Sequence, residues 1–214
     1  MKENGFKMPD LHIGLTTFNN DGEKTSDLYE EGHSWVRNGW NLQFIFMGFC
    51  NGADALFGAG QLSLRNDVGQ IIRYAKPSSL YMDSSSGYSS AIGGIRVGTG
   101  GEPFDIEQYD LVARIPNGVS VDQLNHGGVI DPSYKYNDTE KVWTITHSKE
   151  FSNLSGASIS IAEIGLFWNG EMMVGTQYRY MTARDVLSSP VTVANGEILR
   201  VSYEISMDYS SIDS

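Results

Sequence analysis

The end of the chain alternates apolar and polar residues with the period of a β-strand. Every second position of LRVSYEISM is apolar, and these positions are Leu199, Val201, Tyr203, Ile205 and Met207. Successive side chains of a strand point to opposite faces, so this spacing predicts a strand with one buried face. The segment from residue 142 to residue 207 reads as short strands separated by turns, which predicts antiparallel β-structure at the end of the chain.

A change of parity indicates an irregularity in an earlier strand. Ile159 and Ile161 keep the period of two. The next apolar residues take the other parity and are Ile164, Leu166 and Trp168. An extra residue must therefore enter near Ala162 or Glu163, as in a β-bulge.

Asx-Gly dipeptides recur along the chain and predict tight turns, because both residue types tolerate positive φ. They are Asn4-Gly5, Asp21-Gly22, Asn38-Gly39, Asn51-Gly52, Asn117-Gly118, Asn169-Gly170 and Asn195-Gly196. We expect Asn169-Gly170 to form a hairpin turn and Asn195-Gly196 to precede the final strand. This density of turns is typical of a fold made of many short strands.

One segment has a helical pattern instead. The apolar residues between Trp40 and Phe49 surround nearly the whole of a helical wheel, and Gly48 and Gly52 can end a helix. The sequence therefore predicts one short buried helix near residues 38–49. The complete prediction is a mainly β protein, an antiparallel β-sandwich of jelly-roll-like type with this one helix.

The chain of 214 residues, with 40% hydrophobic content, is long enough for one compact domain. We expect an N-terminal arm or edge strands in residues 1–30, a single β-sandwich domain in residues 31–207 and a tail in residues 208–214. The only cysteine, Cys50, cannot form an intrachain disulfide and is expected to be a buried thiol. The N-terminus lacks the apolar stretch of a signal peptide, and no apolar run approaches the roughly 20 residues of a membrane helix. We therefore expect a soluble protein without membrane contacts.

The formal net charge is −11, and the basic residues are scattered along the sequence. Binding to phosphate backbones requires clustered Lys and Arg, so nucleic acid is not expected as a partner.

A glycine-rich segment in the middle, GIRVGTGGEP, does not match a phosphate-binding loop. Pro103 stands where the last glycine of G-x-G-x-x-G belongs, and no Lys-Ser or Lys-Thr pair follows. We interpret Gly98, Gly100 and Gly101 as structural, allowing the backbone to turn where a Cβ would clash.

Catalytic patterns are weak in this chain. The histidines are far apart, and neither H-x-H nor H-x-x-x-H occurs, so no metal site is predicted. They are His12, His33, His126 and His147. The best carboxylate pair for glycoside cleavage is Glu163 and Glu204, but Glu163 falls at the predicted bulge, where polar groups commonly satisfy displaced backbone. We expect neither an enzyme nor a cofactor.

The phrase ARDVLSSPV contains three residues with expected structural roles. Arg184 and Asp185 are neighbours in an extended segment and should point to opposite faces. Arg184 can bridge carbonyl or carboxylate oxygens with its fork of donors, and Asp185 can hold a turn into Val186. Pro190 lacks an N–H and marks an edge or the start of a strand.

Several of these phrases together resemble a widespread group of tailed-bacteriophage virion proteins of small β-sandwich type. The matching phrases are GIRVGTGGEPFDIEQYDL, SGASISIAEIGLF and ARDVLSSPVTVANGEILRVSYEI, with EGHSWVRNGWNLQF near the start. The likeness spans residues 31–207, except residues 57–90 and 125–138. It implies a structural role in the virion, with assembly in the cytoplasm of a bacterial host, and does not fix the station within the particle. We expect the tail or neck rather than the head. The implied partners are other virion proteins and copies of this chain, and no catalytic residue is implied.

Two function classes remain open, with a glycoside hydrolase as a distant third. The first is an assembly protein that docks by multivalent protein–protein contacts, and the second is a carbohydrate-binding module for host glycans. Sugar binding requires exposed aromatic rings beside polar groups. The tryptophans lie in apolar periodic segments and are predicted to be core; they are Trp35, Trp40, Trp143 and Trp168. The candidate contact residues lie in segments expected to be exposed and irregular, and they are Tyr81, Tyr88, Tyr134 and Tyr136.

Overall fold

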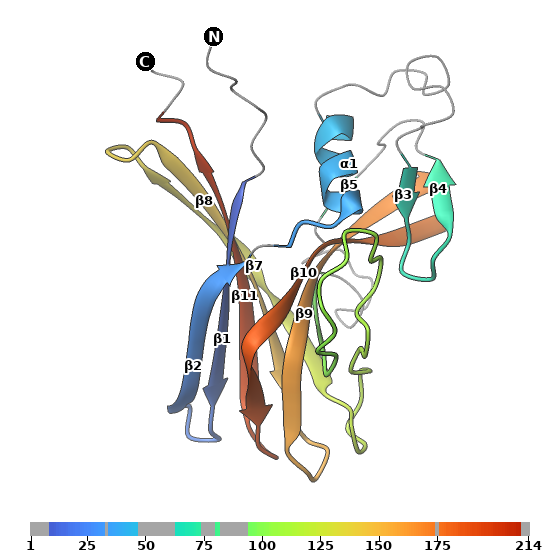
Figure 1. Cartoon of the computed structure of the whole chain (residues 1–214). Helices are drawn as coiled ribbons and strands as arrows, with labels where there is room; N and C mark the ends of the chain where they lie inside the picture. Colours follow the sequence, from blue (N-terminus) through green and yellow to red (C-terminus); the bar gives the residue numbers. More distant parts are fainter. Residues whose placement is uncertain are drawn as a thin grey trace.

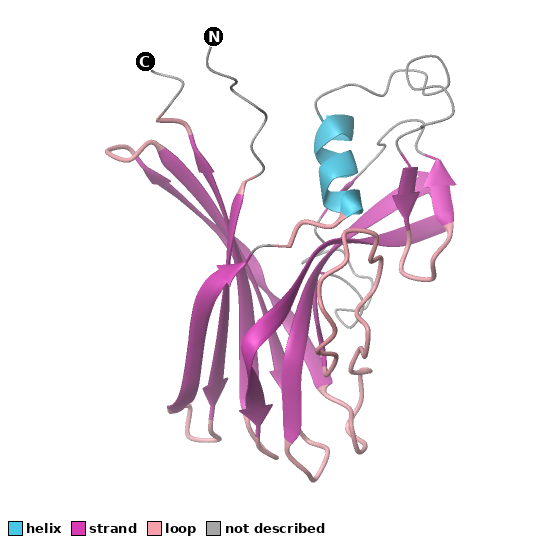
Figure 2. Ribbon diagram, viewed as in Figure 1, coloured by secondary structure: helices cyan, strands magenta, loops and turns pink. Residues whose placement is uncertain are grey.

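The structure is a computed structural model that describes residues 9–32, 34–46, 63–73, 80–81, 94–173 and 176–210. In chain order the elements are β1 (Asp10–Phe18), β2 (Lys24–Gly32), α1 (Arg37–Phe46), β3 (Ser63–Arg65), β4 (Ile71–Arg73), β5 (Leu80–Tyr81), β6 (Gly94–Gly98), β7 (Asn125–Asn137), β8 (Val142–Ser152), β9 (Ile159–Met173), β10 (Thr176–Val193) and β11 (Ile198–Asp208). The described chain is mainly strand, with one short helix (Figure 2).

Two antiparallel sheets form the body of the protein. The five-stranded sheet has the order β2-β1-β11-β8-β7. In the four-stranded sheet β10 pairs with β9, and both β5 and β6 also pair with β9. The two sheets pack together over the lower half of the molecule and diverge above it (Figure 1). The predicted antiparallel β-sandwich is therefore confirmed.

The core lies between the sheets where they overlap. The five-stranded sheet contributes Leu11, Ile13, Leu15, Phe151, Leu199, Val201 and Tyr203, and the four-stranded sheet contributes Ile95, Val97, Ile159, Ile161, Ile164, Leu166, Val191 and Val193. Leu199, Val201 and Tyr203 are fully buried, which confirms the predicted register of the last strand. The buried face is shorter than predicted, because Ile205 is only partly buried and Met207 is exposed.

The predicted irregularity near Ala162 is present, but the extra residues lie on the other strand. Between paired positions, β9 advances two residues from Ile161 to Glu163, whereas β10 spans five from Val191 to Val186. Pro190 lies within this interruption and is exposed. Its missing N–H therefore removes no hydrogen bond from the ladder.

Two of the predicted turns are confirmed. Asp21-Gly22 joins β1 to β2 with φ of 79° at the glycine, and Asn195-Gly196 joins β10 to β11 with φ of 91° at the glycine. Asn117-Gly118 lies in the loop before β7, and Asn4-Gly5 and Asn51-Gly52 lie outside the described residues.

Two other turn predictions are wrong. Asn169-Gly170 lies inside β9, where β10 pairs on one side and β5 on the other, so the hydrogen-bonded ladder overrides the local preference for a turn. Asn38-Gly39 lies in α1. A Cβ at Gly39 would lie 2.5 Å from the Thr182 carbonyl oxygen, so the glycine permits the close approach of α1 to β10.

The predicted helix is present and begins one residue earlier, at Arg37. The Asn38 side chain donates to the Arg65 carbonyl and accepts from the Arg65 N–H, both at 2.8 Å, which ties α1 to β3. Asn38, Gly39 and Leu42 are buried. Cys50 and the glycines expected to end the helix lie outside the described residues.

Residues 99–124 form a third layer over the outer face of β9 and β10 (Figure 1) and return to the main core at Ile115 and Leu124. Leu111 from this layer packs with Val36, Phe167 and Met181 in a second apolar cluster. Residues 163–167 of β9 are all buried because β9 is covered on both faces. The predicted division into residues 1–30, 31–207 and 208–214 stays a prediction, although β1 and β2 belong to the same sheet as β11.

Candidate interaction surface

The five-stranded sheet extends beyond the region that the four-stranded sheet covers. In Figure 1 the upper parts of β7, β8 and β11 form an arm that diverges from β9 and β10. Phe151 and Val201 face the core from the lower parts of β8 and β11. Because side chains alternate strictly along a strand, the same face of the sheet continues up the arm, where the second sheet no longer covers it.

Two successive rungs of paired residues lie on this face, the first at the margin of the core, where Ile205 packs against the core, and the second beyond it. Directly opposite residues of antiparallel strands lie on the same side of a sheet. One rung is Tyr134, Ile145 and Ile205, and the next is Tyr136, Trp143 and Met207. We call these six residues the aromatic strip.

Four of the six residues of the aromatic strip are exposed, and Ile145 and Ile205 are partly buried. The exposed fractions are 66% for Tyr134, 42% for Tyr136, 45% for Trp143 and 40% for Met207. The rings of Tyr136 and Trp143 contact each other with centroids 5.0 Å apart. Contiguous exposed apolar side chains of this kind mark interaction sites in soluble proteins.

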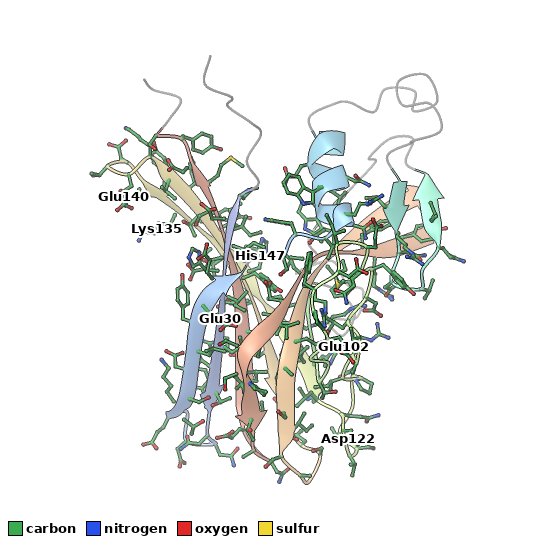
Figure 3. All side chains as sticks on the ribbon, viewed as in Figure 1. Glu30, Glu102, Asp122, Lys135, Glu140 and His147 are labelled. Carbon is green, nitrogen blue, oxygen red and sulfur yellow. The ribbon has the colours of Figure 1, made fainter. Side chains whose placement is uncertain are left out.

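The surroundings of the aromatic strip carry little net charge. At its base, His147 pairs with the buried Tyr203, and burial lowers the pKa of His147 to about 4, so the imidazole is neutral at neutral pH. In the turn at its tip, Lys141 and Asp138 form an ion pair of 2.9 Å, and Asn137 donates to Glu140. Figure 3 shows Glu140 at the far end of the arm and His147 near the level where the sheets diverge.

The four candidate tyrosines have different outcomes. Tyr134 and Tyr136 are exposed, as predicted, but they lie in the regular strand β7 rather than in an irregular segment. Tyr81 was also expected in a loop and instead lies in β5, paired with Asn169. Tyr88 lies outside the described residues.

The prediction that all four tryptophans are core is wrong for Trp143. Trp35 is partly buried against the main core, and its Nε1–H donates to the Pro9 carbonyl at 2.9 Å. Trp40 and Trp168 are also partly buried. Trp143 keeps the strand period but lies beyond the end of the opposing sheet, so the period alone could not reveal its exposure.

A buried ion pair between β9 and β10 lies beneath the layer of residues 99–124. Arg184 Nε donates to Glu163 Oε2 at 2.7 Å, and both side chains are fully buried. The two Glu163 oxygens also accept from the N–H groups of Gly100 at 3.2 Å, Val112 at 3.2 Å and Ala113 at 2.7 Å. Glu163 therefore fixes residues 99–124 to the outer face of β9.

Arg184 holds the same layer from β10. Its Nη1 donates to the Glu102 carbonyl and to Gln108 Oε1, each at 3.1 Å. Its Nη2 is buried and has no hydrogen-bond partner among the described residues. Arg184 therefore bridges a carboxylate and a carbonyl oxygen through its several N–H donors, as predicted from the sequence.

Asp185 points to the opposite face, as its position in the strand requires. The Tyr203 hydroxyl donates to Asp185 Oδ2 at 3.1 Å in the sandwich interior. Burial, and then the nearby Asp185 carboxylate, raise the pKa of Tyr203. The expected turn into Val186 is wrong, because β10 continues through both residues.

Glu163 leaves no space for a Cβ at two glycines of the middle segment. A Cβ on Gly98 or Gly100 would lie 2.5 Å or 2.6 Å from Glu163 Oε1, whereas a Cβ on Gly101 would meet nothing within 4 Å. The expected clash is therefore present at Gly98 and Gly100, and its cause is a buried carboxylate that the sequence did not connect with them.

The carboxylate pair considered for glycoside cleavage is not brought together. Glu163 faces residues 99–124 on the outer side of the four-stranded sheet. Glu204 neighbours the core-facing Tyr203 in β11, so it points to the outer side of the five-stranded sheet, where it accepts from the Tyr29 hydroxyl at 3.2 Å. Both sheets of the sandwich lie between the two groups.

Within the residues that the structure describes, no three His, Cys, Asp or Glu side chains are grouped so that they could hold a metal ion. His12 stacks on Tyr29, His126 packs edge-on against Phe151, and His33 lies outside the described residues. In the same part of the chain, no helix is long and apolar enough to cross a membrane.

Comparison of the chain with protein-family models, with curated proteins and with solved structures found no match.

Proposed function

We propose that this protein is a structural component of a tailed-bacteriophage virion, in the tail or neck, that docks on neighbouring virion proteins through the aromatic strip. The observation that carries the proposal is the uncovered continuation of the core-facing sheet surface on β7, β8 and β11. The phrase-level resemblance of the sequence to phage virion proteins supports the same function.

The aromatic strip is small, so a single contact through it is expected to be weak. Many such contacts in one assembly hold the protein in place. Covering the exposed half of a large apolar side chain contributes roughly 1 kcal/mol. The four exposed members of the strip together supply a few such contributions, part of which is offset by the entropy lost on association. In a symmetric particle every further contact is effectively intramolecular, so repeated weak contacts hold firmly.

Carbohydrate binding is the second candidate, because the paired rings of Tyr136 and Trp143 offer a platform on which a sugar ring could stack. Sugar sites also require polar groups beside the rings. Here the adjoining strip residues Ile205 and Met207 are apolar, and Asp138 and Glu140 already bond to Lys141 and Asn137. This composition favours a protein surface as the partner.

The test is incorporation of a Trp143→Ser variant into particles that contain no wild-type copy. Truncating a central interface tryptophan commonly costs about 2 kcal/mol or more, which corresponds to roughly 30-fold in affinity. We expect the variant to remain folded by circular dichroism, because Trp143 lies outside the core, and its copy number per particle by quantitative mass spectrometry to fall strongly.

Phe104→Ser is the matched control, because Phe104 is also an exposed aromatic residue but lies in the layer of residues 99–124. This control should be incorporated normally. Normal incorporation of Trp143→Ser would contradict the proposal. Binding to a glycan array that disappears in Trp143→Ser would instead support the second candidate.

A further inference from the structure

Basic residues that are far apart in the sequence meet at the β3–β4 hairpin. Arg96 binds Asp67 at 3.0 Å and Asp110 at 3.4 Å, and Arg179 binds the same Asp67 oxygen at 3.3 Å. Arg114 lies 3.5 Å from Asp110 and 3.9 Å from Asp67. Arg65, in β3, lies over the ring of Tyr109 at 4.0 Å. We call Arg65, Arg96, Arg114 and Arg179, with Asp67 and Asp110, the arginine cluster.

The arginine cluster has two more cations than anions, and part of that charge faces solvent. Arg96 is buried, whereas the side chains of Arg114 and Arg179 are 44% and 35% exposed. Arg114 makes its ion contacts without a hydrogen bond, and Arg65 is exposed. Each guanidinium has five donors, so Arg65, Arg114 and Arg179 keep donors available for further carboxylates.

A strongly acidic surface lies on the β1–β2 hairpin. Residues 10–32 contain six acidic residues, Asp10, Asp21, Glu23, Asp27, Glu30 and Glu31, and one Lys, Lys24, which gives a local charge of −5. Asp21, Glu23, Asp27 and Glu31 are exposed. β2 is also an edge strand of its sheet, and among the described strands only β1 pairs with it.

The two surfaces lie on opposite sides of the molecule. Figure 1 shows β2 at one side and the β3–β4 hairpin at the other. Two complementary surfaces placed in this way cannot both contact the same neighbour. They generate head-to-tail association, which closes into a ring or continues as a filament.

We propose that copies of this chain associate head to tail, with the acidic β1–β2 hairpin of one copy against the arginine cluster of the next. Two chains of net charge −11 repel each other in most orientations. The excess positive charge of the arginine cluster makes this one orientation attractive, and complementary charge fixes orientation more than it adds affinity. The inference rests on the proposed assembly function but uses a surface separate from the aromatic strip.

Sedimentation velocity of the full chain at low and high salt tests the association. The screening length falls from about 10 Å at 0.1 M salt to about 3 Å at 1 M. The protein is measured at concentrations up to its solubility limit. We expect oligomers at low salt and monomers at high salt. A chain that is monomeric in both conditions would overturn the inference.

Charge reversal tests the pairing of the two surfaces. Replacing the four exposed acidic residues Asp21, Glu23, Asp27 and Glu31 by lysine changes the local charge of the hairpin from −5 to +3. Arg65→Glu/Arg114→Glu changes the arginine cluster from two excess cations to two excess anions without touching the buried Arg96. Each variant alone should be monomeric at low salt, because its two surfaces then carry the same sign. An equimolar mixture should associate again, since every contact in an alternating array is once more between opposite charges.

The control is Asp138→Lys/Glu140→Lys in the β7–β8 turn, which changes the net charge by as many units as the arginine-cluster variant, with opposite sign, and should still associate. Circular dichroism checks that all variants fold. Self-association of either reversed variant, or a mixture that stays monomeric, would overturn the inference. Trp143→Ser separates the two proposals: it should retain salt-sensitive self-association while losing incorporation into particles.

Discussion

Replacing Glu163 by alanine is expected to lower the free energy of unfolding by about 3–5 kcal/mol, because it leaves a buried cation without its counter-charge. Arg184 would keep only the Glu102 carbonyl and the Gln108 amide oxygen as acceptors. The N–H groups of Gly100, Val112 and Ala113 would lose their acceptor in the same step. Urea denaturation followed by circular dichroism measures the change.

Glu150→Ala is the matched control, since Glu150 pairs with Arg200 at the same distance of 2.7 Å but at the surface. Exposed ion pairs contribute about 0–1 kcal/mol, so this variant should unfold almost like the wild type. Similar losses of unfolding free energy in the two variants would show that the buried Glu163–Arg184 pair contributes no more to stability than an exposed ion pair. Adding Arg184→Met to Glu163→Ala should recover part of the lost stability, because it removes the unpaired charge.

Replacing Val201 by aspartate is expected to prevent soluble expression. Val201 is fully buried between the sheets, and an unpaired carboxylate there costs several kcal/mol, which is a large part of a domain's total stability of about 5–15 kcal/mol. The measurement is the yield of soluble protein after expression.

Arg200→Ala and Glu204→Ala are the controls for Val201→Asp, because their side chains lie on the outer face of the same strand. Both should be soluble and only mildly destabilised. Wild-type solubility of Val201→Asp would mean that the strand presents its other face to the core.

Strand periodicity made much of the fold predictable. The period of two identified the inward face of β11, and the parity change marked the irregularity near Ala162. Side chains of neighbouring residues in an extended segment point to opposite faces of the sheet. This rule correctly placed Arg184 and Asp185 on opposite faces. The sequence could not show that the extra residues belong to β10, because either strand of a ladder can carry them.

Features that depend on distant parts of the chain were not predictable. The exposure of Trp143 depends on where the opposing sheet ends, which leaves no mark in the sequence around Trp143. Asn169-Gly170 has the local chemistry of a turn, but pairing with strands on both sides outweighs it. The basic residues that are scattered in the sequence gather around Asp67 only because β3, β6, β10 and residues 99–124 meet there.

Hydroxyl-radical footprinting of intact particles, compared with the isolated protein, tests the docking role of the aromatic strip most directly. If the strip is a docking surface, modification of Tyr136, Trp143 and Met207 should fall several-fold in the particle, while the exposed Phe104 stays equally reactive. Equal reactivity of Trp143 in the particle and in the isolated protein would contradict the account.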